Sequence, residues 1–145
     1  MQQRTMMTYR QPYPKFTTAN APFWNALRRR QVMLPRCQEC MSWIWPISAM
    51  CQSCWSESVG WEEVSGRGTI NSWVRYHRAF APEYDDKIPY NVIEVTLREG
   101  IRLMSNLETE DDSALQCGTP VKPFFDDVAD DLTLLRFTPD RGDDV

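Results

Sequence analysis

Histidine is almost absent from this chain: its 145 residues contain only His77. A single histidine excludes a site built from several imidazole ligands, and it leaves little from which to build a histidine-based catalytic triad. The sequence also lacks a Walker loop, the glycine fingerprint of dinucleotide-binding folds and the G-x-S-x-G elbow of serine hydrolases. Because no catalytic signature is present, we assign no catalytic residue.

Long apolar runs are missing as well. The most apolar window, residues 41–50, contains Pro46 and two serines and is far shorter than the roughly 20 residues that span a bilayer. The first ten residues carry no apolar run after their charges, which argues against a secretory signal. We therefore predict a cytoplasmic protein without a membrane segment. In a reducing cytoplasm its five cysteines are expected to be thiols or metal ligands rather than disulfides.

Charge is divided unevenly along the chain. Residues 1–80 hold ten basic and four acidic side chains, a net charge of +6, whereas residues 81–145 hold six basic and sixteen acidic side chains, a net charge of −10. This asymmetry predicts a basic face for an anionic ligand, with the acidic half facing water or a partner. A solvated charged surface explains the acidic half equally well.

Four of the five cysteines form two C-x-x-C pairs, Cys37 with Cys40 and Cys51 with Cys54, separated by ten residues. Each pair can turn two thiolates toward one metal ion, and two such turns supply four tetrahedral corners. Thiolates select zinc or iron, and we predict zinc because redox iron would need an electron partner that the sequence does not show. Four protein ligands leave no position for water or substrate, so we predict one structural zinc ion per chain. Cys117 is expected to be a small buried apolar residue.

Helical spacing of apolar residues is confined to the region after residue 20. Asn20 is expected to cap this helix, Pro22 suits its first turn, and Phe23 and Leu27 share one face. Pro35 is expected to close the element, because the residue before a proline avoids helical angles. From residue 59 the pattern has the two-residue period of β-strands, which predicts strands over 59–64, 70–80, 90–97, 101–107, 119–125 and 132–137.

The strand pattern indicates a mainly β fold. Five of these strands, one of them long and bent at glycines, suit a closed or partly open barrel such as an OB-fold, although a five-stranded sandwich or a barrel of another topology would give a similar pattern. Pro123 places the 119–125 strand at a sheet edge. The expected division is an N-terminal arm and helix over 1–35, a zinc ribbon over 36–58, the barrel over 59–139 and a disordered tail over 140–145.

Six tryptophans are many for a chain of this length. Three of them, Trp43, Trp45 and Trp55, fall in the cysteine segment, and a metal ribbon is too thin to bury all three. We therefore expect part of this surface to be an interface.

Taken in order, these features resemble a known family. The motifs that carry the resemblance are Phe23-Trp24 with Leu27, Leu34-Pro35-Arg36-Cys37-x-x-Cys40, Trp45-Pro46, Cys51-x-x-Cys54, Ser65-Gly66-Arg67-Gly68, His77-Arg78, Pro89-Tyr90, Gly100, Gly118 and Arg136-Phe137. Over about residues 20–139 the chain is similar to acyl-CoA-associated proteins that combine a zinc ribbon with an OB-fold and act as small partners of thiolase-like enzymes.

The resemblance implies a rubredoxin-like zinc ribbon followed by a five-stranded OB-fold barrel, with Cys37, Cys40, Cys51 and Cys54 as zinc ligands. It implies a non-catalytic subunit of a thiolase-like aldolase, a thiolase or a 3-hydroxy-3-methylglutaryl-CoA synthase, in a hetero-oligomer that acts on acyl-CoA thioesters, steroid side-chain CoA esters among them. The catalytic groups then lie on the partner. This subunit, inactive alone, would stabilise the partner and help to form its CoA or substrate channel.

The basic first half suits the phosphates of a CoA thioester shared with such a partner, and we assign this contact to Arg36, Arg67 and Arg78. The main alternative is a module that binds single-stranded nucleic acid, because zinc ribbons and OB-folds both occur in that class. The strongly acidic barrel half argues against it, since it repels phosphate. A small iron-containing redox protein is a third interpretation.

Overall fold

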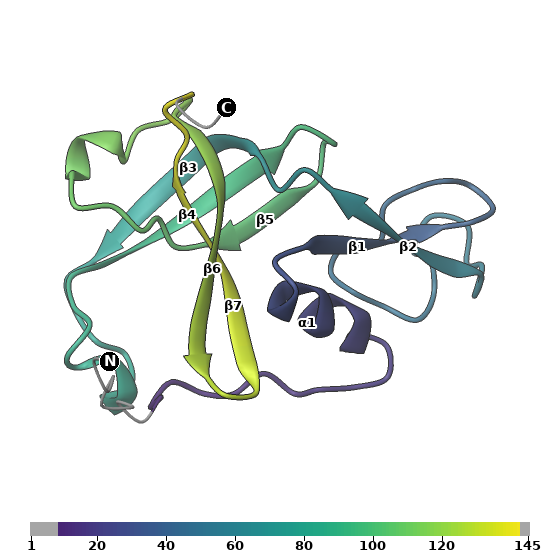
Figure 1. Cartoon of the computed structure of the whole chain (residues 1–145), viewed down its shortest axis with the longest axis horizontal. Helices are drawn as coiled ribbons and strands as arrows, with labels where there is room; N and C mark the ends of the chain where they lie inside the picture. The colour runs from purple at the N-terminus through teal and green to yellow at the C-terminus, as the bar shows by residue number, and fades with distance from the viewer. Residues whose placement is uncertain (1–8, 143–145) are drawn as a thin grey trace.

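The computed structural model describes residues 9–142, which fold into one helix, a small ribbon and a barrel (Figure 1). Part of the expected N-terminal arm, residues 1–8, and half of the expected disordered tail, residues 143–145, lie outside the described residues. No helix among residues 9–142 is both long enough and apolar enough to cross a membrane. The regular elements are α1 (Ala21–Arg28), β1 (Val32–Cys37), β2 (Val59–Val64), β3 (Gly68–Tyr76), β4 (Tyr90–Leu97), β5 (Arg102–Ser105), β6 (Pro120–Ala129) and β7 (Leu132–Pro139), with short 3-10 turns at Pro82–Tyr84 and Asp112–Ala114.

Helix α1 buries the face that its sequence predicts. Phe23 and Leu27 are buried together with Ala26, and a proline occupies the first turn. Asn20 occupies the N-cap position but makes no side-chain capping bond. Its Oδ1 instead accepts a hydrogen bond from the Thr17 N–H at 2.8 Å, so the expected cap is wrong and the residue closes the turn that precedes the helix.

Strand β1 was not predicted, because Pro35 indicated only the end of the preceding element. In the structure Pro35 lies within β1, opposite Trp61 of the antiparallel partner β2. The two strands form a separate two-stranded sheet, so each is an edge strand that pairs with another strand on one side only. A proline can occupy such a strand because its missing N–H faces away from the partner.

The remaining strands form a nearly closed barrel in the order β5-β4-β3-β6-β7, all antiparallel. The gap between the two outer strands is spanned by a single bridge between Leu107, just beyond β5, and Phe137 of β7. At this bridge the Glu108 N–H donates to the Phe137 carbonyl at 2.7 Å. The mainly β class with a five-stranded barrel is therefore confirmed. The barrel core contains Ile70, Ile93, Val95, Leu97, Ile101, Leu103, Leu107, Val121 and Phe137.

Strand β3 is shorter than its pattern predicts. The register between β3 and β4 shifts between Ile70 and Ser72, so a bulge breaks the two-residue period. Ile70 is buried but Val74 is about half exposed, and Phe80 lies beyond the strand with 74% of its surface exposed. Strand β6 lies between β3 and β7, so the expectation that Pro123 marks a sheet-edge strand is wrong. The proline is tolerated because β6 pairs with β3 only at Pro120 and Val121, which leaves Pro123 paired on one side alone.

Helix α1 lies between the ribbon and the barrel and contacts β1 on one side and β6 and β7 on the other (Figure 1). Leu27 is fully buried in this position. The helix therefore joins the two β-structures into one continuous core, to which Trp43 and Trp45 also contribute.

Candidate metal centre

Two turns of the same form hold the four cysteines. In the first, the Cys37 N–H donates to the Ser42 carbonyl and the Met41 N–H donates to the Cys37 carbonyl. In the second, Cys51, Ser56 and Trp55 repeat this pattern at the same spacing. The first turn starts from the last residue of β1, and the second lies on the loop that returns to β2. Equal spacing thus gives two copies of one local structure.

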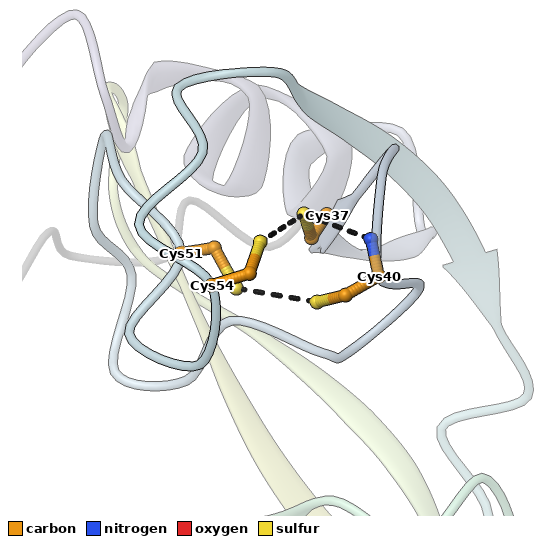
Figure 2. Close-up of side chains that lie close together, drawn as sticks. All are labelled: Cys37, Cys40, Cys51 and Cys54. Atoms are coloured by element: carbon orange, nitrogen blue, oxygen red, sulfur yellow. Dashed lines mark hydrogen bonds between the residues drawn. The ribbon is translucent and has the colours of Figure 1, made fainter.

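The four side chains point toward one another across these turns (Figure 2). The Sγ atoms of Cys37 and Cys54 are 3.5 Å apart, those of Cys40 and Cys51 are 3.6 Å apart, and all four sulfur atoms lie within 4.8 Å of one another. Four sulfurs around a zinc ion at about 2.3 Å would be roughly 3.8 Å apart, so the donor set fits a tetrahedral thiolate site. All five cysteines are free thiols in this structure.

Packing around the cysteines is thin. Cys37 and Cys51 are buried with Ile44, and Val59 packs against them, whereas Cys40 and Cys54 are exposed. Three buried side chains are too few to hold a segment of about twenty residues by apolar burial alone. A metal ion held by the four cysteines would add order to this segment, because ion binding and folding are coupled in such sites.

The thiols differ in acidity. Hydrogen bonding to Ser42, first through its hydroxyl and then through its N–H, lowers the pKa of Cys40 to about 6. The Cys40 N–H is the main cause that lowers the pKa of Cys37. At Cys54 the Ser56 N–H lowers the pKa, but the Cys37 sulfur, burial and the other sulfurs raise it more, to about 12. The thiols thus compete for the available donors, and a cation among them favours ionisation of the whole set.

The residue after each cysteine pair adopts a left-handed backbone conformation. Met41 has φ of 62° and Trp55 has φ of 66°. Neither side chain favours this region, and both are exposed, Trp55 to 73%. The sequence gives no signal for this conformation, since glycine or asparagine is its usual mark. Only the symmetry between the two turns identifies these positions.

The Arg36 side chain is bonded to the first cysteine turn and to β2. Its Nε donates to the Met41 carbonyl at 2.7 Å, its Nη1 lies 3.1 Å from Oε2 of Glu62, and its guanidinium lies 4.6 Å from the centre of the Trp43 ring. These contacts tie the first cysteine turn to β2. The side chain assigned to a CoA phosphate therefore has a structural role that sequence reasoning did not find.

Arg67 and Arg78 lie at opposite ends of β3. The strand has nine residues, so its ends are roughly 30 Å apart and the two side chains do not meet on one phosphate group. Arg67 forms an ion pair with Asp140. Arg78 is exposed and lies 5.8 Å from the centre of the Phe80 ring, with no ion pair among residues 9–142.

Other residues singled out by the sequence lie away from the cysteines. Cys117 is exposed, so the expectation that it is buried is wrong; it lies in a turn before Gly118 rather than in a strand. His77 is exposed just beyond β3. Trp43 and Trp45 pack against the main core, which leaves Trp55 as the tryptophan that the ribbon exposes.

Two family models match adjacent parts of the chain. The rubredoxin-like zinc ribbon domain of ChsH2 matches residues 24–60, and the C-terminal OB-fold domain of ChsH2 matches residues 61–126. The ribbon match contains all four clustered cysteines, so a zinc ribbon with cysteines positioned for metal binding is supported both by the comparison and by the geometry.

Two curated proteins are similar to the chain. It is 30% identical over 128 residues to a probable enoyl-CoA hydratase alpha subunit of Thermomonospora curvata. It is 27% identical over 129 residues to the 3-oxo-4,17-pregnadiene-20-carboxyl-CoA hydratase alpha subunit of Mycobacterium tuberculosis. Each match covers 88% of this chain and 40% of the relative, so the chain spans two fifths of the length of these relatives.

Solved structures share the arrangement of ribbon and barrel. A chain of the structure described as the Ltp2-ChsH2(DUF35) aldolase aligns with a TM-score of 0.77 and 29% identity, covering 88% of this chain and 98% of that one. A DUF35 family protein of unknown function from Sulfolobus solfataricus aligns with a TM-score of 0.61 and 16% identity, covering 93% of each chain, and supports the fold alone.

Proposed function

Since this chain belongs to the family that joins the ChsH2 zinc ribbon to the ChsH2 OB-fold, we propose that it is the non-catalytic, zinc-bearing subunit of a thiolase-like aldolase complex that acts on acyl-CoA thioesters. One observation carries most of this proposal: the chain superimposes on nearly the whole of a chain from an aldolase described as a complex of Ltp2 with ChsH2. The absence of a catalytic signature in the sequence agrees with a role in which the partner supplies the reacting groups.

Zinc is the proposed metal, one ion per chain, held by Cys37, Cys40, Cys51 and Cys54. Four thiolates saturate a tetrahedral ion, so it has no open position for a substrate and its role is structural. The thin packing around the cysteines supports this role. Thiolates persist in a reducing compartment, which is why we place the protein in the cytoplasm.

The proposed substrates are CoA thioesters, with steroid side-chain esters as the favoured class because one relative is named for a pregnadiene-carboxyl-CoA. The subunit would stabilise its partner and help to form the CoA channel. Among the three arginines assigned to CoA phosphates, Arg78 is the one whose guanidinium has no carboxylate partner among the described residues.

Native mass spectrometry of the tagged chain, isolated from its own cells under mild conditions, tests both parts of the proposal. We expect a complex that contains a thiolase-like subunit and one zinc ion for each copy of this chain. The Cys40→Ser variant should lose the zinc. The matched control is Cys117→Ser, because Cys117 is exposed and outside the cysteine cluster, and this variant should keep both zinc and partner.

A zinc-bound chain isolated without a partner, or one that carries an oligonucleotide, would overturn the subunit proposal in favour of a binding module. Full zinc retention by Cys40→Ser would overturn the assignment of the ligands.

A further inference from the structure

Two large apolar residues lie beside the exposed part of the cysteine cluster. Met41 and Trp55 each follow the second cysteine of a pair, and 45% and 73% of their surfaces are exposed. The cysteines that precede them, Cys40 and Cys54, are the exposed members of the cluster, and their sulfur atoms lie within 4.8 Å of each other. Met41 and Trp55 therefore occupy equivalent positions at the solvent-facing side of the two turns, and together they form the apolar tip of the ribbon.

The apolar tip adds little to the stability of the chain that carries it. Neither Met41 nor Trp55 belongs to the barrel core or to the cluster around the cysteines, and Trp55 makes no ring contact within residues 9–142. Both residues have positive φ, which destabilises any residue that has a Cβ, so glycine would suit either position better. Strained residues that gain no packing in return are typical of functional sites.

The unpaired charges beside the apolar tip are acidic. Glu39 lies between the first two cysteines and Glu57 lies two residues after Trp55; both are exposed, and neither forms an ion pair in the described part of the chain. The one basic side chain of residues 36–58, Arg36, is paired with Glu62. Acidic neighbours disfavour nucleic acid and anionic lipid as the occupant. An apolar centre with an acidic rim instead complements a protein pocket with a basic rim.

We propose that the apolar tip docks into an apolar pocket, rimmed by lysine or arginine, on the thiolase-like partner, with Trp55 as the central anchor. A tryptophan in a desolvated pocket typically carries more binding energy than the residues around it. The inference rests on the proposed function for the existence of the partner, and it adds the surface of this chain that binds it.

The test compares glycine variants of the full, zinc-loaded chain. Trp55→Gly and Met41→Gly remove the apolar side chains and relieve the backbone strain, so both variants should keep their zinc and their fold. The thiolase-like subunit recovered with the tagged chain, identified by its peptide sequences, is produced separately and titrated calorimetrically. We expect Trp55→Gly to weaken binding about thirtyfold and Met41→Gly about fivefold, as for a central anchor and its neighbour.

Two further variants separate exposure from position and from charge. Met104→Ala is the control for exposure, because Met104 is 72% exposed on β5 of the barrel, and it should leave the affinity for the thiolase-like subunit unchanged. The double variant Glu39→Gln with Glu57→Gln should slow association about threefold at low salt, because charges at the rim of an interface mainly steer the encounter. Added salt should reduce this difference.

Each part of the proposal can fail separately. A Trp55→Gly chain that binds the thiolase-like subunit as tightly as the original chain would overturn the docking surface and leave the proposed function standing. Equal weakening by Met104→Ala would show that binding does not depend on the apolar tip, and faster association of the double variant would exclude a basic rim.

Recovery of no thiolase-like subunit would overturn the proposed function and the docking surface with it. Dimerisation of the chain that Trp55→Gly abolishes would assign the apolar tip to a second copy and overturn the proposal in that way.

Discussion

At the scale of single residues, the two cysteine turns hold backbone conformations that their side chains do not favour. Met41 and Trp55 occupy the left-handed region directly after each cysteine pair. For a residue other than glycine this conformation costs roughly 1–2 kcal/mol. The Trp55 side chain is mostly exposed, so packing does not offset the cost. The turns keep this geometry because it directs the cysteine sulfurs inward.

Replacing Trp55 with glycine tests this view. Glycine adopts positive φ without strain but has more freedom to lose on folding, so we expect Trp55→Gly to raise the free energy of unfolding of the zinc-loaded chain by about 0.5–1 kcal/mol. Urea unfolding followed by circular dichroism measures the change. Trp55→Ala removes the same ring but keeps a Cβ and should give no increase. Equal stabilisation by both variants would refute the role of strain.

Arg78 provides the residue-scale test of CoA recognition. Because its guanidinium has no carboxylate partner in residues 9–142, Arg78→Ala should leave the fold intact and weaken acyl-CoA binding by the complex about tenfold, the loss of one charge-assisted hydrogen bond. Isothermal titration with an acyl-CoA measures this loss. Arg29→Ala is the control, since Arg29 lies at the end of α1 and bonds only its own helix. Unchanged affinity in Arg78→Ala would remove Arg78 from the assignment.

At the scale of elements, the barrel depends on one close approach between strands. Gly68 opens β3 opposite Leu97 of β4, and a Cβ placed on it would lie 2.2 Å from the Thr96 carbonyl oxygen. The obstacle is backbone, so it does not rotate away as a side chain would. Glycine at this position therefore allows β3 to pair with β4 and β6 at once.

Substituting this glycine should disturb both ladders. We expect Gly68→Ala to lower the free energy of unfolding by about 1–3 kcal/mol, the usual cost of inserting a methyl group into a space that lacks room for it. Thr69→Ala, at the exposed neighbouring position, should change stability by less than half of that amount. Thermal denaturation of the zinc-loaded chain compares the two. A Gly68→Ala variant as stable as the original chain would show that the strands separate at little cost.

At the scale of the whole molecule, the ribbon and the barrel differ in how much of their order depends on the metal. The barrel has its own apolar core, whereas the ribbon cluster consists of Cys37, Ile44 and Cys51 with Val59 packed against it. Loss of the ion removes the main link between the two cysteine turns. The ribbon loop is therefore expected to unfold before the barrel does.

Chelation of the metal should expose this difference. After treatment with a strong chelator, we expect chymotrypsin to cut after Trp43 at least ten times faster, because Trp43 is partly buried in the ordered ribbon. NMR resonances of Ile93, Val95 and Leu97 should stay dispersed, since these side chains lie in the barrel core. Restored zinc should restore protection. Loss of barrel resonances together with the ribbon would show that the two parts unfold as one unit.

The sequence predicts local regularity better than it predicts exceptions to it. Strict alternation at Ile93, Val95 and Leu97 matches their burial, and the cysteine spacing correctly predicts that the four sulfurs meet. Pro35 misleads because its local effect on a helix says nothing about the strand partner that β1 finds in β2. The bulge after Ile70 is equally hidden, since it depends on the register with β4.

Side-chain roles depend on distant neighbours and were harder to predict. Arg36 is basic and near a cysteine, which suits an anion-binding residue, but Glu62 becomes its partner only when β1 and β2 pair. A cavity beside Trp24 combines α1, the ribbon loop and β7, which are far apart in the sequence.

The base of the ribbon has a consequence for how the polypeptide can be divided. Val32 faces Val64 and Cys37 faces Val59, so the chain enters and leaves the ribbon at one place. A cut between Cys40 and Cys51 would give two fragments, each with half of the ligand set. Their reassembly would then depend on the concentration of free metal, because the ion replaces the severed peptide as the connection. The ribbon is thus a natural split point for a metal-dependent two-fragment protein.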